Sequence, residues 1–335
     1  MVANDAATLP ASLHGIHLRT GERVEVRLAG RPSLGHDVTR FRALVFGAGD
    51  FQTRTEDRPP PPELLAGDRF ALGPLSALVE RTLGHPRLVS LRFEDEPDAI
   101  WSGLAQHGRP IQYAHLPLPL ALRDVWAPIA AAPVAFEPPS AGFALDWQAL
   151  ERMKGRGISF ATVTHAAGIS STGDEELDAR LPFDEPYQIS EATAFAIRRA
   201  QARNTRVVAV GTTVVRALEN AALRDGRVRA GPGMATERVD ATSRLRVVDA
   251  LLSGTHEPGT SHYELLRAFT DDATLLRVND ELEARGYRTH EFGDSVLIER
   301  KVLRARSQRH VTARLEDPAG SRPRLPARCA RGCVG

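Results

Sequence analysis

The strongest candidate for binding chemistry is the run RVVAVGTTVVRALE at residues 206–219, where an apolar strand breaks at Gly211 and a helix opens on Thr212 and Thr213. A turn of this kind lies at the carboxyl edge of an α/β sheet, where free backbone N–H groups, the two hydroxyls and Arg216 would face a crevice. Such a crevice suits an anionic or hydroxyl-rich ligand. The alternative is an ordinary strand-to-helix turn in which a threonine is the N-cap.

Two histidines that follow other apolar strands are candidates for proton transfer. His165 comes directly after ISFATVT, and His256 lies in the segment GTHEPGTS that follows RVVDALL. Because imidazole titrates near neutral pH, either ring could act as a general base or acid. Either could equally pin its own loop by hydrogen bonds. Polar loops at 137–142 and 290–294 accompany them, and all these loops could converge on one crevice with the turn at Gly211.

Three charged residues near these loops have both a binding and a structural interpretation. Arg216 could pair bidentately with a ligand carboxylate, or could form a salt bridge to Glu219 or Asp249. Asp249 occupies an apolar strand, and a buried aspartate requires a partner. Asp294, placed before the last strand, could hold ligand hydroxyls or initiate a turn.

The histidines also suggest a metal hydrolase, because His-Glu dipeptides occur at 256–257 and 290–291. The spacing argues against this class. His256 and His262 are six positions apart rather than the four that place two ligands on one helix face, and Pro258 between them prevents a helix. We therefore expect no metal.

Two patterns of apolar and polar residues indicate the elements that position these residues. Residues 13–111 contain short alternating runs with Gly and Pro between them, which predicts an antiparallel sheet or small barrel. Beyond residue 110, helical patterns alternate with strands, as in a parallel sheet with helices on its faces. We predict an α/β fold, a three-layer α/β sandwich with a second, smaller antiparallel β-barrel domain. The expected domains are 14–110 for the barrel, 1–13 with 111–300 for the α/β domain, and 301–335 for a basic, flexible tail.

The individual elements can be stated as residue ranges. The expected barrel strands are 23–28, 41–46, 68–72 and 88–93. The expected elements of the second domain are helices at 147–154, 191–203, 214–223, 263–269 and 275–285, and strands at 158–164, 207–210, 246–252 and 295–299.

Composition limits the classes of function. With 43 Lys and Arg against 42 Asp and Glu, the net charge is +1, so any RNA contact must come from a local patch. The sequence contains only two lysines, Lys154 and Lys301, so we do not expect catalysis through a lysine Schiff base. Cys329 and Cys333 lie in the tail without partners for zinc. We find neither a secretory signal nor an apolar run long enough for a membrane, and expect a cytoplasmic protein.

Taken in order, the motifs resemble those of the S-adenosylmethionine:tRNA ribosyltransferase-isomerase family of queuosine biosynthesis. The segment VAVGTTVVRALE at 208–219 is nearly identical to the family's central motif, and PSAG at 139–142 is similar to its Pro-Thr-Ala-Gly loop. Asn4-Asp5 with LPASLHG resembles the family's Asn-Asp segment before its barrel. VVDALL at 247–252 with His256, and FGDSVLI at 292–298, complete a resemblance along nearly the whole chain.

The resemblance implies an unusual use of S-adenosylmethionine, as a ribosyl donor. In the family, its ribose is transferred to the 7-aminomethyl-7-deazaguanine base of tRNA and isomerised, giving epoxyqueuosine with release of adenine and methionine. No metal is required. The sulfonium acidifies the neighbouring C5′ protons, so a base is needed there, and His165 and His256 are the candidates. The resemblance implies a binding set for the donor's ribose and carboxylate: Ser140, Gly142, Gly211, Thr212, Thr213, Arg216, Asp249 and Asp294.

The chain also departs from the family pattern. Gly142-Phe-Ala-Leu145 stands where the family has Gly-Leu-His-Phe, and Phe183-Asp-Glu185 stands where it has His-Ser-Glu, so two histidines are absent. These losses suggest a paralogue with a different, non-tRNA acceptor, or a silent S-adenosylmethionine-binding protein. If RNA binds, arginines at 198–206 could contribute, although a solvated helix face is the alternative. A monomer is expected.

Overall fold

The predicted barrel is present in the computed structural model, which describes residues 1–35, 37–256, 258–288 and 292–300. Six antiparallel strands close in the order β3-β4-β5-β8-β7-β6. The four predicted strands are confirmed within two residues at each end, whereas β3 and β7 were not predicted. The barrel strands are β3 (Ser12–His17), β4 (Arg23–Gly30), β5 (Arg40–Phe46), β6 (Arg69–Leu72), β7 (Leu75–His85) and β8 (Leu88–Phe93).

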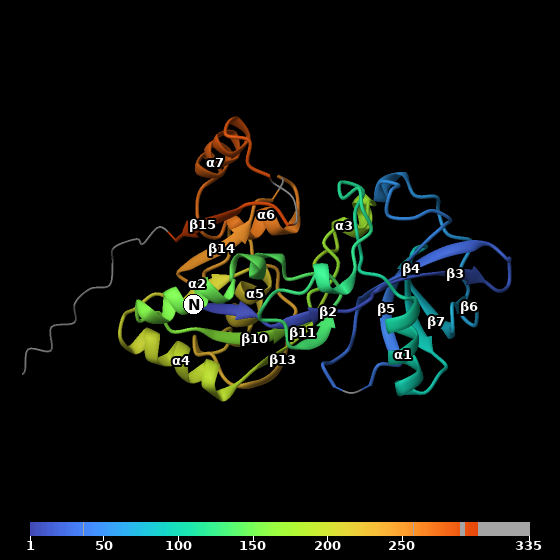
Figure 1. The fold of residues 1–335 in the computed structure, drawn as a ribbon, viewed down its shortest axis with the longest axis horizontal. Helices are drawn as coiled ribbons and strands as arrows, with labels where there is room; N and C mark the ends of the chain where they lie inside the picture. Colours follow the sequence, from blue (N-terminus) through green and yellow to red (C-terminus); the bar gives the residue numbers. More distant parts are fainter. Residues whose placement is uncertain (36, 257, 289–291, 301–335) are drawn as a thin grey trace, which may run out of the picture. The chain divides into compact units, whose positions relative to one another are not determined.

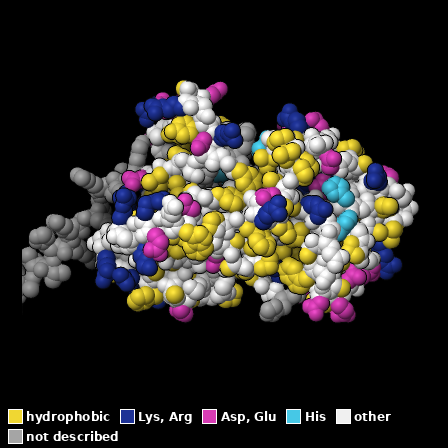
Figure 2. Space-filling view, viewed as in Figure 1, with side chains coloured by type: hydrophobic (Ala, Val, Ile, Leu, Met, Phe, Trp, Pro, Cys, Tyr) yellow, Lys and Arg dark blue, Asp and Glu magenta, His cyan; other side chains and the backbone are white. Residues whose placement is uncertain are grey.

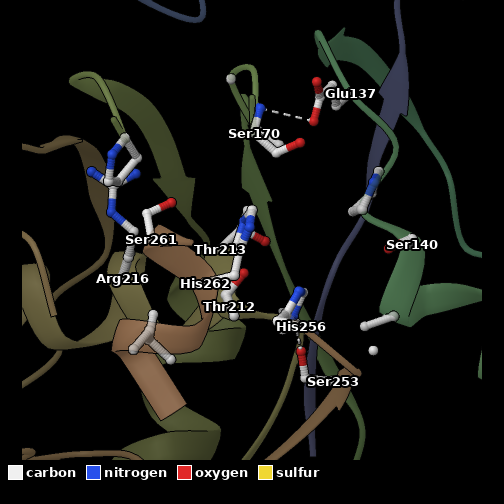
Figure 3. A pocket seen from close by; sticks show the side chains of 18 of the residues that line it. Glu137, Ser140, Ser170, Thr212, Thr213, Arg216, Ser253, His256, Ser261 and His262 are labelled. Atoms are coloured by element: carbon white, nitrogen blue, oxygen red, sulfur yellow. Dashed lines mark hydrogen bonds between the residues drawn. The ribbon is translucent and has the colours of Figure 1, made fainter. Parts of the chain in front are cut away.

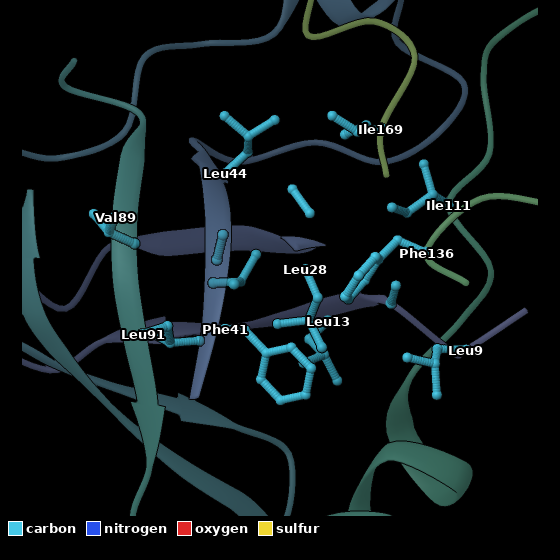
Figure 4. Packing of buried hydrophobic residues seen from close by; sticks show 14 of the residues in the cluster. Leu9, Leu13, Leu28, Phe41, Leu44, Val89, Leu91, Ile111, Phe136 and Ile169 are labelled. Carbon is cyan, nitrogen blue, oxygen red and sulfur yellow. The ribbon is translucent and has the colours of Figure 1, made fainter. Parts of the chain in front are cut away.

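Apolar side chains fill the barrel because alternate residues of each strand point inward. Leu13, Leu28, Phe41 and Leu91 are almost completely buried there and pack together in Figure 4. Phe41 stands edge-on to Phe136, which lies outside the barrel strands, with 6.1 Å between ring centroids. The barrel core is therefore continuous with the segment that leads into the loop at 137–142.

The second sheet has seven strands in the order β13-β11-β10-β1-β12-β14-β15. Its centre, from β10 to β14, is parallel, but β11, β13 and β15 run antiparallel to their neighbours. The prediction of a parallel sheet is therefore confirmed for the centre and wrong for the edges, where antiparallel strands pair. The strands are β1 (Val2–Asn4), β10 (Ala161–His165), β11 (Glu185–Ile189), β12 (Val208–Val210), β13 (Gly231–Ala235), β14 (Ala250–Gly254) and β15 (Ser295–Glu299).

Helices cover both faces of this sheet, which confirms the three-layer arrangement (Figure 1). Successive residues of β1 face opposite sides, with Val2 in one apolar cluster and Ala3 in the other. The 3₁₀ helix η3 (Ser140–Ala144) and α2 (Trp147–Gly155) pack on the Ala3 side. The other cluster contains residues of α4 (Glu191–Ala202), α5 (Thr212–Ala221), α6 (Ser261–Leu266) and α7 (Asp272–Ala284).

Two predicted strands begin later than expected. The strand predicted at 246–252 starts only at Ala250, because the Glu219 carboxylate accepts the backbone N–H groups of Arg246, Val247 and Val248. The strand predicted at 158–164 likewise starts at Ala161. The remaining elements are β2 (Ala6–Thr8) paired with β9 (Ala132–Ala135), α1 (Pro97–His107), α3 (Glu175–Asp178), and the short 3₁₀ helices η1 (Thr55–Asp57) and η2 (Leu122–Asp124).

The chain runs from β1 in the sheet through β2 into the barrel strands, as Figure 1 shows. Residues 1–301 cluster as a single unit that contains both barrel and sheet, so the division into domains stays a prediction. The predicted tail at 301–335 and both cysteines lie outside the described residues. Within the described ranges, no helix is long and apolar enough to cross a membrane.

Candidate active site

The four parallel strands β10, β1, β12 and β14 end at one edge of the sheet, and a pocket lies there. Three of the predicted loops meet at this pocket: 137–142, 165–170 and 254–261. The turn at Gly211 joins them, as expected at the carboxyl edge of such a sheet. Figure 3 labels most of the polar residues that line the pocket. They are Glu137, Ser140, Ser170, Glu185, Thr212, Thr213, Arg216, Ser253, Thr255, His256, Ser261 and His262.

The turn at Gly211 depends on glycine. Gly211 is the N-cap of α5 with φ 94°, a conformation that other residues rarely adopt. No side chain caps this helix, so the interpretation of a threonine as N-cap was wrong. The first turn of α5 therefore presents backbone N–H groups at the pocket beside the Thr212 and Thr213 side chains.

Asn4 ties the ends of β1 and β10 to the start of α5. Its Oδ1 accepts the backbone N–H groups of Ala6 (3.1 Å) and His165 (3.0 Å). Its Nδ2 donates to the His165 carbonyl (3.0 Å) and to Thr213 Oγ1 (3.4 Å). One buried amide thus sets the positions of a candidate histidine and a candidate threonine. The sequence had marked Asn4 only as part of a resembling segment.

His165 is completely buried behind the pocket and does not line it. Its Nδ1 lies 2.7 Å from the Thr213 carbonyl oxygen and its Nε2 lies 2.9 Å from Glu185 Oε2. Both partners are acceptors, so both ring nitrogens are already engaged within the protein. That geometry favours the loop-pinning interpretation of His165 over the role of general base.

Glu185 is the centre of a buried charged cluster. Its carboxylate accepts from His165, from Arg216 Nη1 and from the Gly168 backbone N–H. Burial by itself raises the pKa of Glu185, but Arg216 and the hydrogen bonds outweigh it and lower the pKa to about 2. Glu185 is therefore ionised at neutral pH and supports the pocket floor. Sequence analysis had considered this position only as a departure from the family pattern.

The expected salt bridge from Arg216 to Glu219 or Asp249 was wrong, because Arg216 pairs with Glu185 instead. Besides Glu185, its guanidinium donates to the carbonyl oxygens of Phe183 (3.2 Å) and Ala235 (3.0 Å). Arg216 lines the pocket but is 5% exposed. Because most of its donors are already used, a bidentate pair with a ligand carboxylate would require these contacts to rearrange.

His256 and His262 line the pocket as a stacked pair, with 4.8 Å between ring centroids and planes 20° apart. The Ser253 hydroxyl lies 2.9 Å from His256 Nε2. Burial, and secondarily the neighbouring His262, lower the pKa of His256 to about 3. Burial also lowers the pKa of His262. Both rings are therefore uncharged at neutral pH in the free protein. The sequence singled out His256 but gave His262 no role in the pocket.

Glu137 also lines the pocket, on the side away from Arg216 (Figure 3). Tyr113 Oη lies within hydrogen-bonding distance of Glu137 Oε1 and 3.1 Å from the Ser171 carbonyl oxygen, and the Ser170 N–H donates to Glu137 Oε2 (3.0 Å). Burial raises the pKa of Glu137 despite these hydrogen bonds. The pocket lining thus contains two carboxyl groups whose pKa values are shifted in opposite directions, upward for Glu137 and downward for Glu185.

Of the other predicted binding residues, one lines this pocket and three do not. Ser140 lines it, whereas Gly142 is buried next to Ala127. Asp249 precedes β14, is not buried in the strand, and lies beside Val207 at the opposite edge of the sheet, paired with Arg300 (2.9 Å). Asp294 accepts the Arg288 backbone N–H (2.8 Å), the turn role considered for it. Of the fourth predicted loop, 290–294, residues 290 and 291 lie outside the described residues.

The pocket encloses about 110 Å³, below the ~300 Å³ at the lower end of ligand pockets, so part of a large ligand would extend into its mouth. On the face drawn in Figure 2, Lys and Arg side chains lie among Asp and Glu side chains, in keeping with the net charge of +1. In the described ranges, no group of three or more His, Cys, Asp or Glu side chains could hold a metal ion.

Comparison with known proteins decides the family. The family model described as "Queuosine biosynthesis protein" matches residues 1–298. The chain belongs to this family. Among its relatives, the S-adenosylmethionine:tRNA ribosyltransferase-isomerase of Sorangium cellulosum is 33% identical over 321 residues, which cover 89% of this chain and 83% of the relative. The enzyme of the same name from Gloeobacter violaceus is also 33% identical, over 316 residues and 81% of its length.

One solved structure is also similar to this chain. The crystal structure of S-adenosylmethionine tRNA ribosyltransferase from Thermotoga maritima is 23% identical, with a TM-score of 0.42 and coverage of 89% of this chain and 81% of that one. The family resemblance inferred from the motifs at 139–142 and 208–219 is confirmed by the family model, which spans both.

Proposed function

We propose that this protein is a transferase-isomerase that uses S-adenosylmethionine as a ribosyl donor and 7-aminomethyl-7-deazaguanine in tRNA as the acceptor. The products would be epoxyqueuosine in tRNA, adenine and methionine. The observation that carries the proposal is the pocket at the carboxyl edge of the sheet, within a chain that matches its family from residue 1 to 298. Relatives covered over four fifths of their length bear the name of this activity.

The donor would bind where α5 begins. Backbone N–H groups after Gly211 suit the methionine carboxylate, because a helix N-terminus attracts negative charge. The hydroxyls of Thr212, Thr213, Ser140 and Ser253 line the same pocket and suit the ribose hydroxyl groups. In this proposal Arg216 and Glu185 hold the pocket floor, and neither is the primary contact for the donor.

His256 is the proposed general base. Its ring lines the pocket and is uncharged at neutral pH, whereas both nitrogens of His165 are engaged by acceptors. S-adenosylmethionine supplies a sulfonium that acidifies its C5′ protons, so an imidazole near that carbon could remove one of them. Gly142, Asp249 and Asp294 are assigned structural roles, because none of them lines the pocket.

The acceptor would enter from the open side of the pocket as a base splayed out of a tRNA loop, since proteins read such bases in single-stranded loops. A cytoplasmic location belongs to the proposal, because tRNA and S-adenosylmethionine meet there. A monomer as the working state also belongs to the proposal.

The test is adenine release. Purified protein is incubated with S-adenosylmethionine, with tRNA carrying 7-aminomethyl-7-deazaguanine, and with the same tRNA carrying guanine as the control. Adenine and methionine are followed by chromatography. Release only with the modified tRNA is the expected result. Saturable binding of S-adenosylmethionine without release would instead indicate a different acceptor or a silent binding protein, and absence of binding would refute the donor assignment.

A further inference from the structure

The pocket contains two uncharged imidazoles where the proposed chemistry needs at least one. His256 follows β14 and His262 lies in the first turn of α6, so two different elements bring the rings together. Both line the cavity, as Figure 3 shows. His165, the other histidine near this edge, is engaged at both nitrogens. Among the described residues that line the pocket, these two rings are therefore the imidazoles that can accept a proton.

The stacking couples the two rings electrostatically. Ring centroids 4.8 Å apart place two imidazolium charges in contact, so protonation of one ring opposes protonation of the other. The charged groups that face the pair are Glu185 and Arg216, which are paired with each other and act on His262 in opposite directions. Neither therefore supplies a net charge that would stabilise a second proton on the pair.

Ser253 makes the two rings unequal. Its hydroxyl is 2.9 Å from His256 Nε2 and fixes the orientation of that ring, whereas His262 contacts His256 through the stacked ring faces. An oriented ring beside a second ring that opposes its protonation is an arrangement suited to taking up one proton and later delivering it to another atom.

We propose that His256 and His262 act as one acid–base pair that holds a single proton during turnover. This inference rests on the proposed function. The C5′–H bond of the donor breaks, its electron pair stays on the carbon beside the sulfonium, and the proton moves to the imidazole pair. That electron pair then forms a C4′=C5′ double bond as the C4′–O bond of the ribose ring breaks. The ring oxygen forms a C1′=O double bond as the C1′–adenine bond breaks. The electron pair of that last bond leaves with the adenine nitrogen, which takes the proton from the imidazole pair. Adenine leaves neutral and both imidazoles are again uncharged.

The first experiment measures the shared proton without any substrate. Histidine ring resonances of the full-length protein are titrated by NMR in the wild type and in the His262→Phe variant, which keeps an aromatic ring in the stack. Removing the coupling is expected to raise the pKa of His256 by about one pH unit or more. His14→Gln, at an exposed barrel position, is the matched control and should leave that pKa unchanged. An unchanged pKa of His256 in His262→Phe would overturn the proposal.

The second experiment measures turnover. His256→Gln and His262→Phe are each expected to lower kcat for adenine release by about 10²- to 10⁴-fold, with S-adenosylmethionine affinity changed less than about threefold. Because the rings act as a unit, the double variant should lose no more than about tenfold beyond either single variant. Wild-type activity of His262→Phe would show that the ring serves only packing, and multiplicative losses would show two independent groups; either result overturns the pair. If the wild type itself releases no adenine, the proposed function fails, while the NMR experiment still decides whether the proton is shared.

Discussion

Replacement of Glu185 by glutamine should cost more stability than any surface ion pair in this protein. Glu185 is 5% exposed and receives hydrogen bonds from His165, Arg216 and the Gly168 backbone. Its pKa falls from an ordinary value of 4.5 to about 2, and each pH unit corresponds to ~1.4 kcal/mol, so the ionised carboxylate contributes about 3 kcal/mol. Glutamine also leaves the Arg216 charge without its partner. We therefore expect a loss of about 3–5 kcal/mol.

The assay is urea unfolding at pH 7, followed by circular dichroism. Glu299→Gln is the control, because Glu299 pairs with Arg206 while the two side chains are 56% and 64% exposed. An exposed pair of this kind contributes less than about 1 kcal/mol. A loss of under about 1 kcal/mol for Glu185→Gln, or one equal to that of Glu299→Gln, would refute the reasoning.

The pH dependence provides a second check on the same variant. Because the folded-state pKa of Glu185 is depressed, its contribution is complete above about pH 4.5 and is lost as the pH falls toward about 2. The difference in unfolding free energy between wild type and Glu185→Gln should therefore narrow over this interval. A difference that stays constant down to pH 3 would mean that the ionised carboxylate is not its source.

Further predictions concern the turn, the amide pin and the distal aspartate. Gly211→Ala forces a side chain onto a residue with φ 94° and should weaken S-adenosylmethionine binding at least about tenfold in calorimetry. The control is Gly226→Ala, also at positive φ (72°) but with open space around it. It should cost ~1 kcal/mol of stability and leave binding unchanged. Asn4→Asp removes the Nδ2 donor to the His165 carbonyl and Thr213, so thermal unfolding should report a loss of about 2–3 kcal/mol; a melting temperature equal to that of the wild type would contradict the pinning role. Asp249→Asn should leave S-adenosylmethionine affinity within about twofold of wild type, because Asp249 lies beside Val207 at the far edge of the sheet. A fivefold loss of affinity would show that Asp249 does contribute to binding.

The parts of the fold that could be predicted are those whose signal is local. The apolar run before Gly211 and the helix after it are visible in a short window, and the last strand, Ser295–Glu299, matches its predicted range. Strand β11 contains Pro186, and β13 reads GPGMA, so neither has the composition of an inner strand. Their pairing depends on distant partners, which is why the sheet was predicted as parallel.

The site was predictable as a set of loops but not as a set of contacts. The loop positions followed from where strands end, and three of the four predicted loops do meet. The partner of Arg216 could not be read from spacing, because Glu185 is 31 positions away and reaches it through the antiparallel strand β11. The stacking of His256 on His262 depends on how α6 follows its loop, and the sequence pattern carries no signal for that geometry.

The position of β1 has a consequence for the order in which this protein folds. Asn4 is bonded to His165, 161 positions later in the chain, and β1 also pairs with β12 beyond it. The barrel strands come in between and pair with one another within residues 12–93, so they can associate early. In contrast, β1 must wait for most of the chain before its two partners exist. The central strand of the sheet therefore closes late. Because Asn4 lies at its end, the pocket forms only when the most distant contacts of the fold are complete.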